Sequence, residues 1–344
     1  MSTRAAPAGP AGSDADLLAV IADALPPRPG GHICVAVSGG GDSVALLHLM
    51  VRACRNRGMQ VSAVTVDHRL RPGSAGEAAE VAALCRALRV RHETLAWDHG
   101  KIAGNLMEAA RNARMSLIAQ WARGQGVDCI ALGHTADDQA ETFLMALSRA
   151  SGLDGLIGLR PSWQAEGALW SRPLIGTTRA DLRAYLRRHG IPWAEDPTND
   201  DPRFERVRAR RVMAALAPLG IDAGRIGRTQ GHLRDAKRVL DDALALAVAA
   251  HVADAAGALR VERAGFDRLP RDLQRQLLNA AVAWVSGIAL PPRAEKQVNL
   301  LAAAREGREV TVHGCRLRHQ GDRLLLTRGF RAVAALDGPT DVPW

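Results

Sequence analysis

The sequence predicts an α/β protein: a parallel sheet with helices on both faces, followed by a mainly helical C-terminal domain. Short apolar segments alternate with longer helix-like segments from about residue 16 to residue 149, and parallel strands need such crossover helices. A glycine-rich turn follows the first apolar segment, and polar clusters follow two later ones. Because ligands bind beyond the carboxyl ends of the strands in such sheets, these clusters predict one shared site.

The elements of this first part are predicted from apolar periodicity and from glycine or proline stops. The predicted strands lie at 32–37, 60–66, 90–96 and 128–132. The predicted helices lie at 16–25, 43–57, 76–88, 105–123 and 136–149. After residue 152 the pattern loosens, and further helices are expected at 179–189 and 204–216.

A domain boundary is expected where Pro218 and Gly220 end the helix at 204–216. The following domain should begin with a long helix at 225–255 and end in a few strands within 309–327. The expected organisation is a disordered tail at 1–15, an α/β domain at 16–218, a helical RNA-binding domain with a short β end at 219–330, and a tail at 331–344.

Composition narrows the class of protein. The chain has 344 residues, a formal net charge of +9 and a pI near 10.2, so a polyanion is a plausible partner. None of the five cysteines forms a CxxC pair or a zinc pattern, which is typical of a protein from a reducing cytoplasm. No apolar stretch is long enough to cross a membrane. We therefore expect a cytoplasmic protein without a membrane partner.

The hexapeptide Ser38-Gly39-Gly40-Gly41-Asp42-Ser43 lies between an expected strand and an expected helix. Glycines let the backbone approach phosphate oxygens, and the N–H groups at a helix start favour negative charge. The loop lacks the lysine of the Walker pattern, and it is not GxGxxG. It therefore predicts a phosphate cradle of another kind, with a plain Gly/Ser turn as the alternative.

Polar residues also follow the second expected strand, from Val66 to Ser74. Asp67 and His68 come where that strand ends and should open into the site. The alternative is a polar loop in which Ser74 and Glu77 form a capping box for the next helix. Both interpretations can hold together, because capping leaves Asp67 and His68 free.

The expected helix at 105–123 carries polar residues on one side, since Asn105, Glu108, Arg111 and Asn112 have helical spacing. A solvated face with a Glu108–Arg111 pair accounts for the same spacing, and such a pair is worth only about 0.2–0.5 kcal/mol. Taken alone, this pattern favours the solvated face.

An acidic cluster follows the fourth expected strand: His134 precedes Asp137, Asp138 and Glu141. Asp137 and Glu141 are one helical turn apart on the same face. Carboxylates beside a phosphate cradle suit Mg²⁺, which binds one or two carboxylates plus substrate phosphates. The alternative is a helix cap made by Thr135 and Asp138.

The helix expected at 204–216 begins a basic stretch, with ten Lys/Arg against three acids between residues 203 and 238. A surface for an RNA backbone and an ordinary solvated face are the two interpretations.

Together these motifs resemble the tRNA(Ile)-lysidine synthetase family of PP-loop ATP pyrophosphatases, from about Ile33 to Leu216. The SGGxDS pattern alone is shared by many PP-loop enzymes, whereas the ordered set with VDHxLR and LGHxxDDQxET is specific. Longer relatives carry an additional C-terminal domain, of which this chain shows little. The motifs are SGGGDS at 38–43, VDHRLRPGS at 66–74, NLMEAARNAR at 105–114, LGHTADDQAETFLMALSRASG at 132–152, RPL at 172–174 and EDPTN at 195–199.

The resemblance implies a two-step ligation that uses ATP and Mg²⁺. The O2 atom of the wobble cytidine in the CAU anticodon of tRNA(Ile) attacks the α-phosphate of ATP, and pyrophosphate leaves. The ε-amine of free L-lysine then attacks C2 and expels AMP. The product is lysidine, which switches decoding from AUG to AUA. The implied partners are this tRNA and free lysine, and a homodimer is one possible assembly.

The resemblance also implies roles for individual residues. Asp42 and Asp137 would bind Mg²⁺, Arg111 would stabilise the α-phosphate, and His134 would lie near the reacting base. Asp138 and Glu141 would bind the lysine ammonium group. The residues expected to hold ATP are Ser38, Gly39, Gly40, Gly41, Asp42, Ser43, Val66 and His68. The residues expected to contact tRNA are Arg69, Arg71, Asn105, Glu108, Arg203, Arg206, Arg208 and Arg211.

Two other functions compete with this one. A PP-loop enzyme that thiolates tRNA would be expected to carry CxxC pairs, which this chain lacks. A non-catalytic tRNA-binding protein with a vestigial loop would be expected to have lost Asp42 or Asp137, and both are present.

Overall fold

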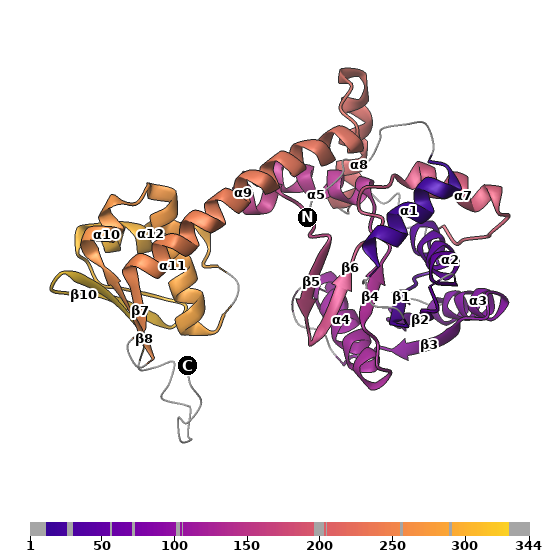
Figure 1. The fold of residues 1–344 in the computed structure, drawn as a ribbon, viewed down its shortest axis with the longest axis horizontal. Helices are drawn as coiled ribbons and strands as arrows, with labels where there is room; N and C mark the ends of the chain where they lie inside the picture. Colours follow the sequence, from indigo (N-terminus) through magenta and orange to yellow (C-terminus); the bar gives the residue numbers. More distant parts are fainter. Residues whose placement is uncertain are drawn as a thin grey trace. The chain divides into compact units, whose positions relative to one another are not determined.

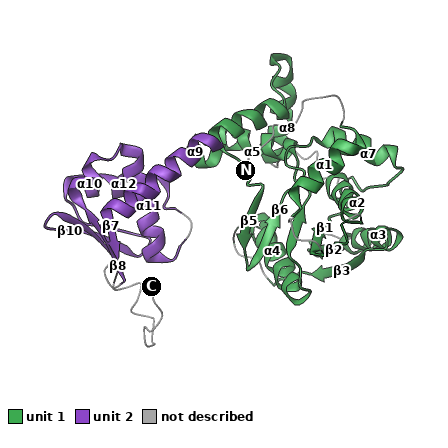
Figure 2. Ribbon diagram, viewed as in Figure 1, with its two compact units in different colours: residues 1–233 green, residues 234–344 purple. Residues whose placement is uncertain are grey.

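The structure is a computed structural model that divides into two compact units, Met1–Leu233 and Arg234–Trp344 (Figure 2). The division lies inside a long helix, later than the boundary expected at 218/219. No helix in the part of the chain that is described is long and apolar enough to span a membrane. The described residues are 12–25, 30–55, 57–70, 73–100, 104, 106–195, 203, 205–254, 257–288 and 291–329.

Unit 1 contains a six-stranded sheet (Figure 1). Its first four strands lie close to the predicted positions, whereas the last two form a hairpin that the sequence did not predict. Its strands are β1 (His32–Ala36), β2 (Gln60–Asp67), β3 (Arg91–Ala96), β4 (Cys129–Leu132), β5 (Ser162–Ala165) and β6 (Ala168–Ser171). Its helices are α1 (Asp14–Ala24), α2 (Gly41–Arg55), α3 (Ser74–Ala87), α4 (Leu106–Gly124), α5 (Ala136–Ser148), α6 (Leu153–Leu156), α7 (Arg179–Arg188) and α8 (Glu205–Leu216), followed by the 3-10 turn η2 (Ala217–Leu219) and the first part of α9 (Ala223–His251).

Helix α1 includes the last two residues of the tail expected at 1–15. Ser13 caps it: the Ser13 hydroxyl accepts from the Asp16 N–H, and the Asp16 carboxylate accepts from the Ser13 N–H. This reciprocal pair satisfies two backbone donors at the helix start, which fixes where the helix begins. The tail expected at 331–344 lies outside the described residues.

The sheet has the order β3-β2-β1-β4-β6-β5, with only β5 antiparallel to its neighbour. Successive residues of β1 alternate between two cores, as the pleat requires. Ile33 and Val35 belong to the core that includes α1, α2, α3 and α7, whereas Cys34 belongs to the core that includes α4 and Trp170. Helices therefore cover both faces, which confirms the predicted fold class.

Strand order reverses between β1 and β4, because β2 and β3 lie on one side of β1 while β4 lies on the other. In sheets of this kind, ligands bind beyond the carboxyl ends of the strands at such a reversal. The glycine-rich loop follows β1, and Gly133 and His134 follow β4. A Cβ atom at Gly133 would lie 2.9 Å from the Cα atom of Ser43. Only a glycine lets these two loops approach so closely.

Unit 2 contains the remainder of α9, three further helices and a five-stranded antiparallel sheet of order β7-β8-β11-β10-β9. The strands expected within 309–327 belong to this sheet, and β7 and β8 complete it. One sheet face buries Val261, Leu317 and Leu324 in a common core with α11 and α12. The elements are β7 (Val252–Asp254), β8 (Ala258–Glu262), α10 (Arg263–Arg268), α11 (Arg271–Ser286), α12 (Ala294–Glu306), β9 (Val310–Val312), β10 (Cys315–Gln320) and β11 (Arg323–Arg328).

The close approach at Gly133 yields a prediction. We expect Gly133→Ala to lower the free energy of unfolding by about 1–3 kcal/mol, because the added methyl group must displace the Ser43 backbone. The matched control is Gly76→Ala in α3, where a Cβ atom meets nothing within 4 Å. That control should be neutral or stabilising by up to about 1 kcal/mol. Urea denaturation compares the two, and equal stabilities would show that the loops do not meet as described.

Candidate active site

The loop after β1 is held in a compact turn by its own side chains. The Ser43 hydroxyl donates to the Gly40 carbonyl (2.9 Å) and accepts from the Ser38 N–H (3.2 Å). Gly39 has a positive φ of 87°, which other residues rarely adopt. Helix α2 begins at Gly41, so Asp42 stands in its first turn beside free N–H groups. This arrangement has the features of an anion cradle.

The loop is braced from outside by the segment that follows α7. The Ala194 N–H donates to the Gly39 carbonyl (3.0 Å), and Gly40 forms an isolated parallel bridge with Ala194. A Cβ atom at Gly41 would lie 3.3 Å from the Trp193 ring, so this glycine also lets the segment pack closely.

Four carboxylates gather around Arg179, the first residue of α7. Its guanidinium donates to Asp138 and to Glu141, both at 2.6 Å, and to Asp42 at 3.2 Å. Its backbone N–H, which has no partner within the helix, donates to Asp137 at 2.7 Å. We call these five residues the acid–arginine cluster. It joins residues from α2, α5 and α7 that lie as much as 137 positions apart.

Asp138 takes part both in a helix cap and in the acidic cluster, the two interpretations that the sequence left open. One carboxylate oxygen accepts from the Thr135 N–H (2.8 Å) and completes a capping box at the start of α5, while the other accepts from Arg179. Burial alone would raise the pKa of Asp138. The charge of Arg179 and the hydrogen bond from Thr135 overcome this and lower the pKa below its usual value.

The pKa of Asp42 moves in the opposite direction, although Asp42 also pairs with Arg179. Burial raises it, and the charges of Asp138 and Asp137 raise it further, so the single cation only partly offsets the crowding. The cluster therefore retains an excess of negative charge beside the anion cradle. A further cation would relieve that excess.

Glu141 is 1% exposed, and its two oxygens differ sharply. Oε1 accepts from Arg179 and from Arg210 of α8, both at 2.6 Å. Oε2 is buried and has no hydrogen-bond partner. An unpaired buried carboxylate oxygen is costly, so it marks a place where a ligand with N–H donors or a cation gains binding energy.

His134 lies on the turn between β4 and α5 and contacts Arg172 rather than an acid. The Arg172 Nε–H donates to the His134 Nδ1 atom at 3.2 Å. Burial lowers the pKa of His134 to about 3, and the charges of Arg172, Arg206 and Arg114 contribute in the same direction. The imidazole is therefore neutral at neutral pH.

Four arginines, Arg111, Arg114, Arg172 and Arg206, form what we call the arginine rim. Burial lowers the pKa of both Arg114 and Arg172. The charges of Arg111 and Arg206 lower the same two pKa values further. Arg206 also lies 3.5 Å from Asp138, which connects this group to the acid–arginine cluster. Such a group of cations attracts phosphate. The exposed Arg111 belongs to this group and therefore lies beside the site, although its helical pattern alone favoured a solvated face.

The segment after β2 is less closely tied to the cluster. Val66 is half-buried in β2, opposite Leu95 of β3. The Nδ1 atom of His68 is buried without a partner, and its ring meets the edge of Trp97 at 5.8 Å. Burial lowers the pKa of His68, as does the charge of Arg114. Arg69 is exposed and pairs with Asp98.

The capping box proposed for Ser74 and Glu77 does not form. Gly73 is the N-cap of α3 and makes no side-chain cap, and Ser74 is already the first helical residue. The Ser74 side chain instead hydrogen-bonds to Asp67, which lowers the pKa of that carboxyl.

Helix α8 divides its arginines between the site and the surface. Arg210 contacts Glu141, and Arg206 lies 3.5 Å from Asp138. Arg208 and Arg211 are exposed. Arg203 and Glu108 are also exposed, while Arg71 and Asn105 lie outside the described residues.

Sequence reasoning missed Arg179 as the centre of the cluster, and it missed Arg172 as the partner of His134. Arg179 stands at the start of a helix, where an arginine is unremarkable by itself. One signal was present: three acids in one short segment require a buried cation, and the sequence after RPL offers one.

No group of three or more His, Cys, Asp or Glu among the described residues is arranged to hold a metal ion. The residues do fit a cation that arrives with phosphates, because Asp42 stands next to the anion cradle and its pKa is raised by burial and by Asp138 and Asp137 despite its pair with Arg179. Mg²⁺ commonly uses only one or two carboxylates beside the phosphates of its substrate.

Comparisons with known proteins agree on the fold and on one family. Residues 14–216 match the family model of the PP-loop domain. A tRNA(Ile)-lysidine synthase of Ruegeria pomeroyi is 43% identical over 321 residues, which cover 93% of this chain and 76% of the relative. One from Methylobacterium sp. (strain 4-46) is 39% identical over 306 residues, covering 86% and 88%. The U34-tRNA thiolase NcsA of Methanococcus maripaludis superposes with a TM-score of 0.55 at 14% identity, covering 64% of this chain and 78% of that chain, and shows the shared fold.

The acid–arginine cluster yields a second prediction. Arg179→Met should lower the free energy of unfolding by about 3–5 kcal/mol at pH 7.5, because it leaves buried carboxylates unpaired. In the native protein the lowered pKa of Asp138 contributes stability above its unfolded pKa, and this is lost as pH falls through the folded pKa. In the variant that pKa should rise above the unfolded value, so the deficit should shrink as pH falls toward 5.

Urea denaturation at pH 7.5 and pH 5 measures this difference. The matched control is Arg183→Met in the same helix, whose exposed pair with Glu195 at 3.9 Å is worth about 0–1 kcal/mol. A loss as small as that of the control, or one that does not change with pH, would contradict the pairing described.

Proposed function

Because this chain belongs to the tRNA(Ile)-lysidine synthase family of PP-loop enzymes, we propose that its acid–arginine cluster and arginine rim form the site of a two-step ligation. The enzyme uses ATP to join free lysine to C2 of the wobble cytidine in the CAU anticodon of tRNA(Ile), through an adenylated cytidine. AMP and pyrophosphate are the other products. Lysidine pairs with A instead of G, which changes decoding from AUG to AUA.

The observation that carries the assignment of the site is the buried, unpaired Oε2 atom of Glu141. A lysine ammonium group has three N–H donors and a positive charge, so it matches both the missing hydrogen bond and the excess of negative charge. Asp138 lies beside it, on the same Arg179 guanidinium. We propose that the ε-amine of lysine enters here and reaches C2 from this side.

The phosphates of ATP belong to the loop after β1 in this proposal. The N–H groups of Gly39, Gly40 and Gly41 and the start of α2 would bind the departing pyrophosphate, with the hydroxyls of Ser38 and Ser43. Asp42 and Asp137 would hold Mg²⁺, which supplies charge compensation on the phosphates. Val66 and His68, at the end of β2, would contact the nucleotide.

The arginine rim suits the two anionic substrates. Arg111 would stabilise the α-phosphate during attack by the cytidine O2 atom, a task for which guanidinium geometry is favourable. The residues expected from the sequence to contact tRNA would bind the anticodon stem and loop, whose unpaired bases can leave their stack at low cost. These residues are Arg69, Arg71, Asn105, Glu108, Arg203, Arg206, Arg208 and Arg211.

The homodimer, the cytoplasmic location and the helical RNA-binding role of 219–330 stay predictions. Unit 2 begins in α9 and carries its own core, which supports a separate domain beyond the catalytic one.

The reaction assay is the first test. The reaction contains ATP, Mg²⁺, radiolabelled lysine and a tRNA transcript with the CAU isoleucine anticodon. We expect label to enter the tRNA together with pyrophosphate release. Asp42→Asn should abolish both, while the control Asp23→Asn, on the exposed side of α1, should be fully active. Release of pyrophosphate without label would keep the adenylation step and assign another nucleophile. A folded protein that releases none would be a binding protein.

A second variant tests the lysine site alone. Glu141→Gln keeps an acceptor for Arg179 and Arg210 but removes the charge, so the KM for lysine should rise about 10–100-fold, or about 1.4–2.7 kcal/mol. The KM for ATP should change less than about twofold. Glu205→Gln, which alters the exposed partner of Arg149, is the control. An unchanged lysine KM in a folded Glu141→Gln enzyme would remove this role.

A further inference from the structure

Arg172 reaches the site because of strand register. Strands β4 and β6 are parallel neighbours, with Ala131 opposite Ser171. The next residues along both strands leave the sheet at the same edge, so Arg172 emerges beside the turn that carries His134. Arg172 is 6% exposed, which is rare for an arginine and requires its charge and its donors to be satisfied locally.

The guanidinium of Arg172 is anchored on several sides. Its Nη1–H donates to the Arg160 carbonyl at 2.6 Å, and its Nε–H donates to His134 Nδ1 at 3.2 Å. The group lies 4.0 Å from the centre of the Trp163 ring, and Trp163 stacks on Trp170 with ring centres 5.9 Å apart. A planar cation that lies against one aromatic ring and donates two hydrogen bonds has little rotational freedom, so its Nε–H direction is set by the β5–β6 hairpin and the residues beside it.

An arginine has N–H donors and no acceptor. The His134 Nδ1 atom must therefore present its lone pair to Arg172, and the ring proton of the neutral imidazole must be on Nε2. Protonation of Nδ1 would place two N–H groups against each other. The charges of Arg172, Arg206 and Arg114 disfavour protonation of the ring, and the charge of Asp138 opposes them.

We infer that Arg172 is a positioning residue that holds His134 as the neutral Nε2–H tautomer. In this state His134 donates a hydrogen bond from Nε2 to a substrate oxygen and cannot accept a proton there. His134 then contributes by polarising an oxygen of the substrate, either on the phosphate or on the cytosine, and does not serve as the base for the lysine amine. The tautomer follows from the geometry alone, whereas its part in catalysis rests on the proposed function.

The test begins with nuclear magnetic resonance of the full chain labelled with ¹⁵N-histidine, without substrates. The ¹⁵N shifts distinguish a protonated ring nitrogen from an unprotonated one, and His134→Gln identifies the His134 signals by their loss. We expect Nε2 protonated and Nδ1 unprotonated in the native enzyme. A native spectrum with Nδ1 protonated overturns the inference, whatever the variants do.

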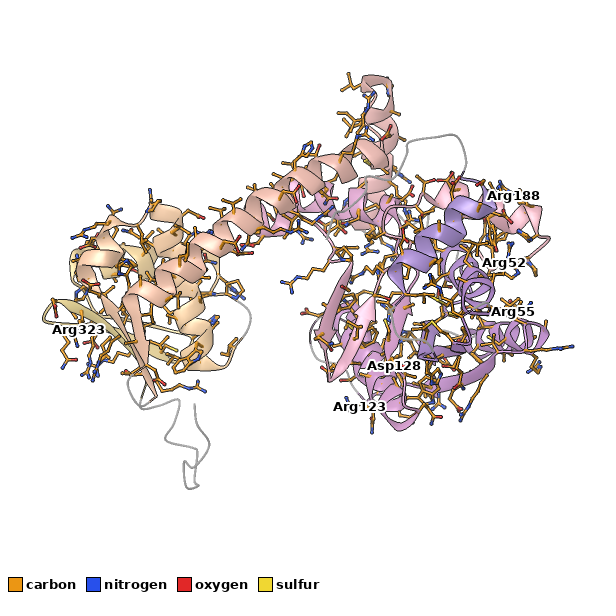
Figure 3. All side chains as sticks on the ribbon, viewed as in Figure 1. Arg52, Arg55, Arg123, Asp128, Arg188 and Arg323 are labelled. Carbon is orange, nitrogen blue, oxygen red and sulfur yellow. The ribbon has the colours of Figure 1, made fainter. Side chains whose placement is uncertain are left out.

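Arg172→Met is then compared with Arg123→Met. Arg123 lies at the end of α4 (Figure 3) and donates to the Glu166 carbonyl of the same hairpin. Arg172→Met should release the tautomer preference and lower kcat for lysine transfer at least about tenfold, with little change in the KM for lysine. Arg172→Lys, which keeps a donor, should retain the tautomer and recover part of kcat. Arg123→Met should change neither.

An unchanged His134 spectrum in folded Arg172→Met would overturn the positioning role. The expected tautomer in a native enzyme that transfers no lysine would leave the positioning role intact and refute the proposed function instead. The two failures are thus distinguishable.

Discussion

The arrangement of this site depends on one partly buried cation. Arg179 binds Asp42, Asp138 and Glu141 through its guanidinium and Asp137 through its backbone N–H. Carboxylates this close together cannot all ionise in a partly dry environment without a compensating charge. Because those acids come from α2 and α5 and the cation from α7, the ion pairs also fix the position of three helices. The same ion pairs thus compensate the charges of the acids and hold the helices together.

The compensation is incomplete, and the deficit is what makes the cluster suitable for ligands. The raised pKa of Asp42 and the unpaired Oε2 atom of Glu141 are two independent signs of it. The arginine rim adjoins the cluster through Arg206, 3.5 Å from Asp138, and burial together with the charges of Arg111 and Arg206 lowers the pKa values of Arg114 and Arg172. A site in which negative charge adjoins positive charge can bind a cationic amine at the acids and a polyphosphate at the arginines at the same time.

The topology of the sheet explains why these groups meet. Strand order reverses between β1 and β4, which is where ligands bind in such sheets, and the segments after β1 and β4 come into contact at Gly133. The parallel pairing of β4 with β6 brings Arg172 to the same edge. Short loops on a rigid sheet hold the side chains without adding a separate scaffold, which is why residues distant in the sequence share one site.

The sequence by itself determined the α/β fold, the first four strands of unit 1 and most of its helices, the family, and the position of the cradle and the acids at the strand ends; the β5–β6 hairpin was missed. Periodicity and the ordered motifs are local, so they can be seen in a linear chain. Only the tertiary structure decided that Arg179 and Arg210 neutralise those acids, that Arg172 holds His134, and that Ser74 bonds to Asp67 instead of capping α3. These partners come from segments with no distinctive pattern of their own. Which cation meets which acid is set by burial and strand register, and neither is encoded in the spacing of nearby residues.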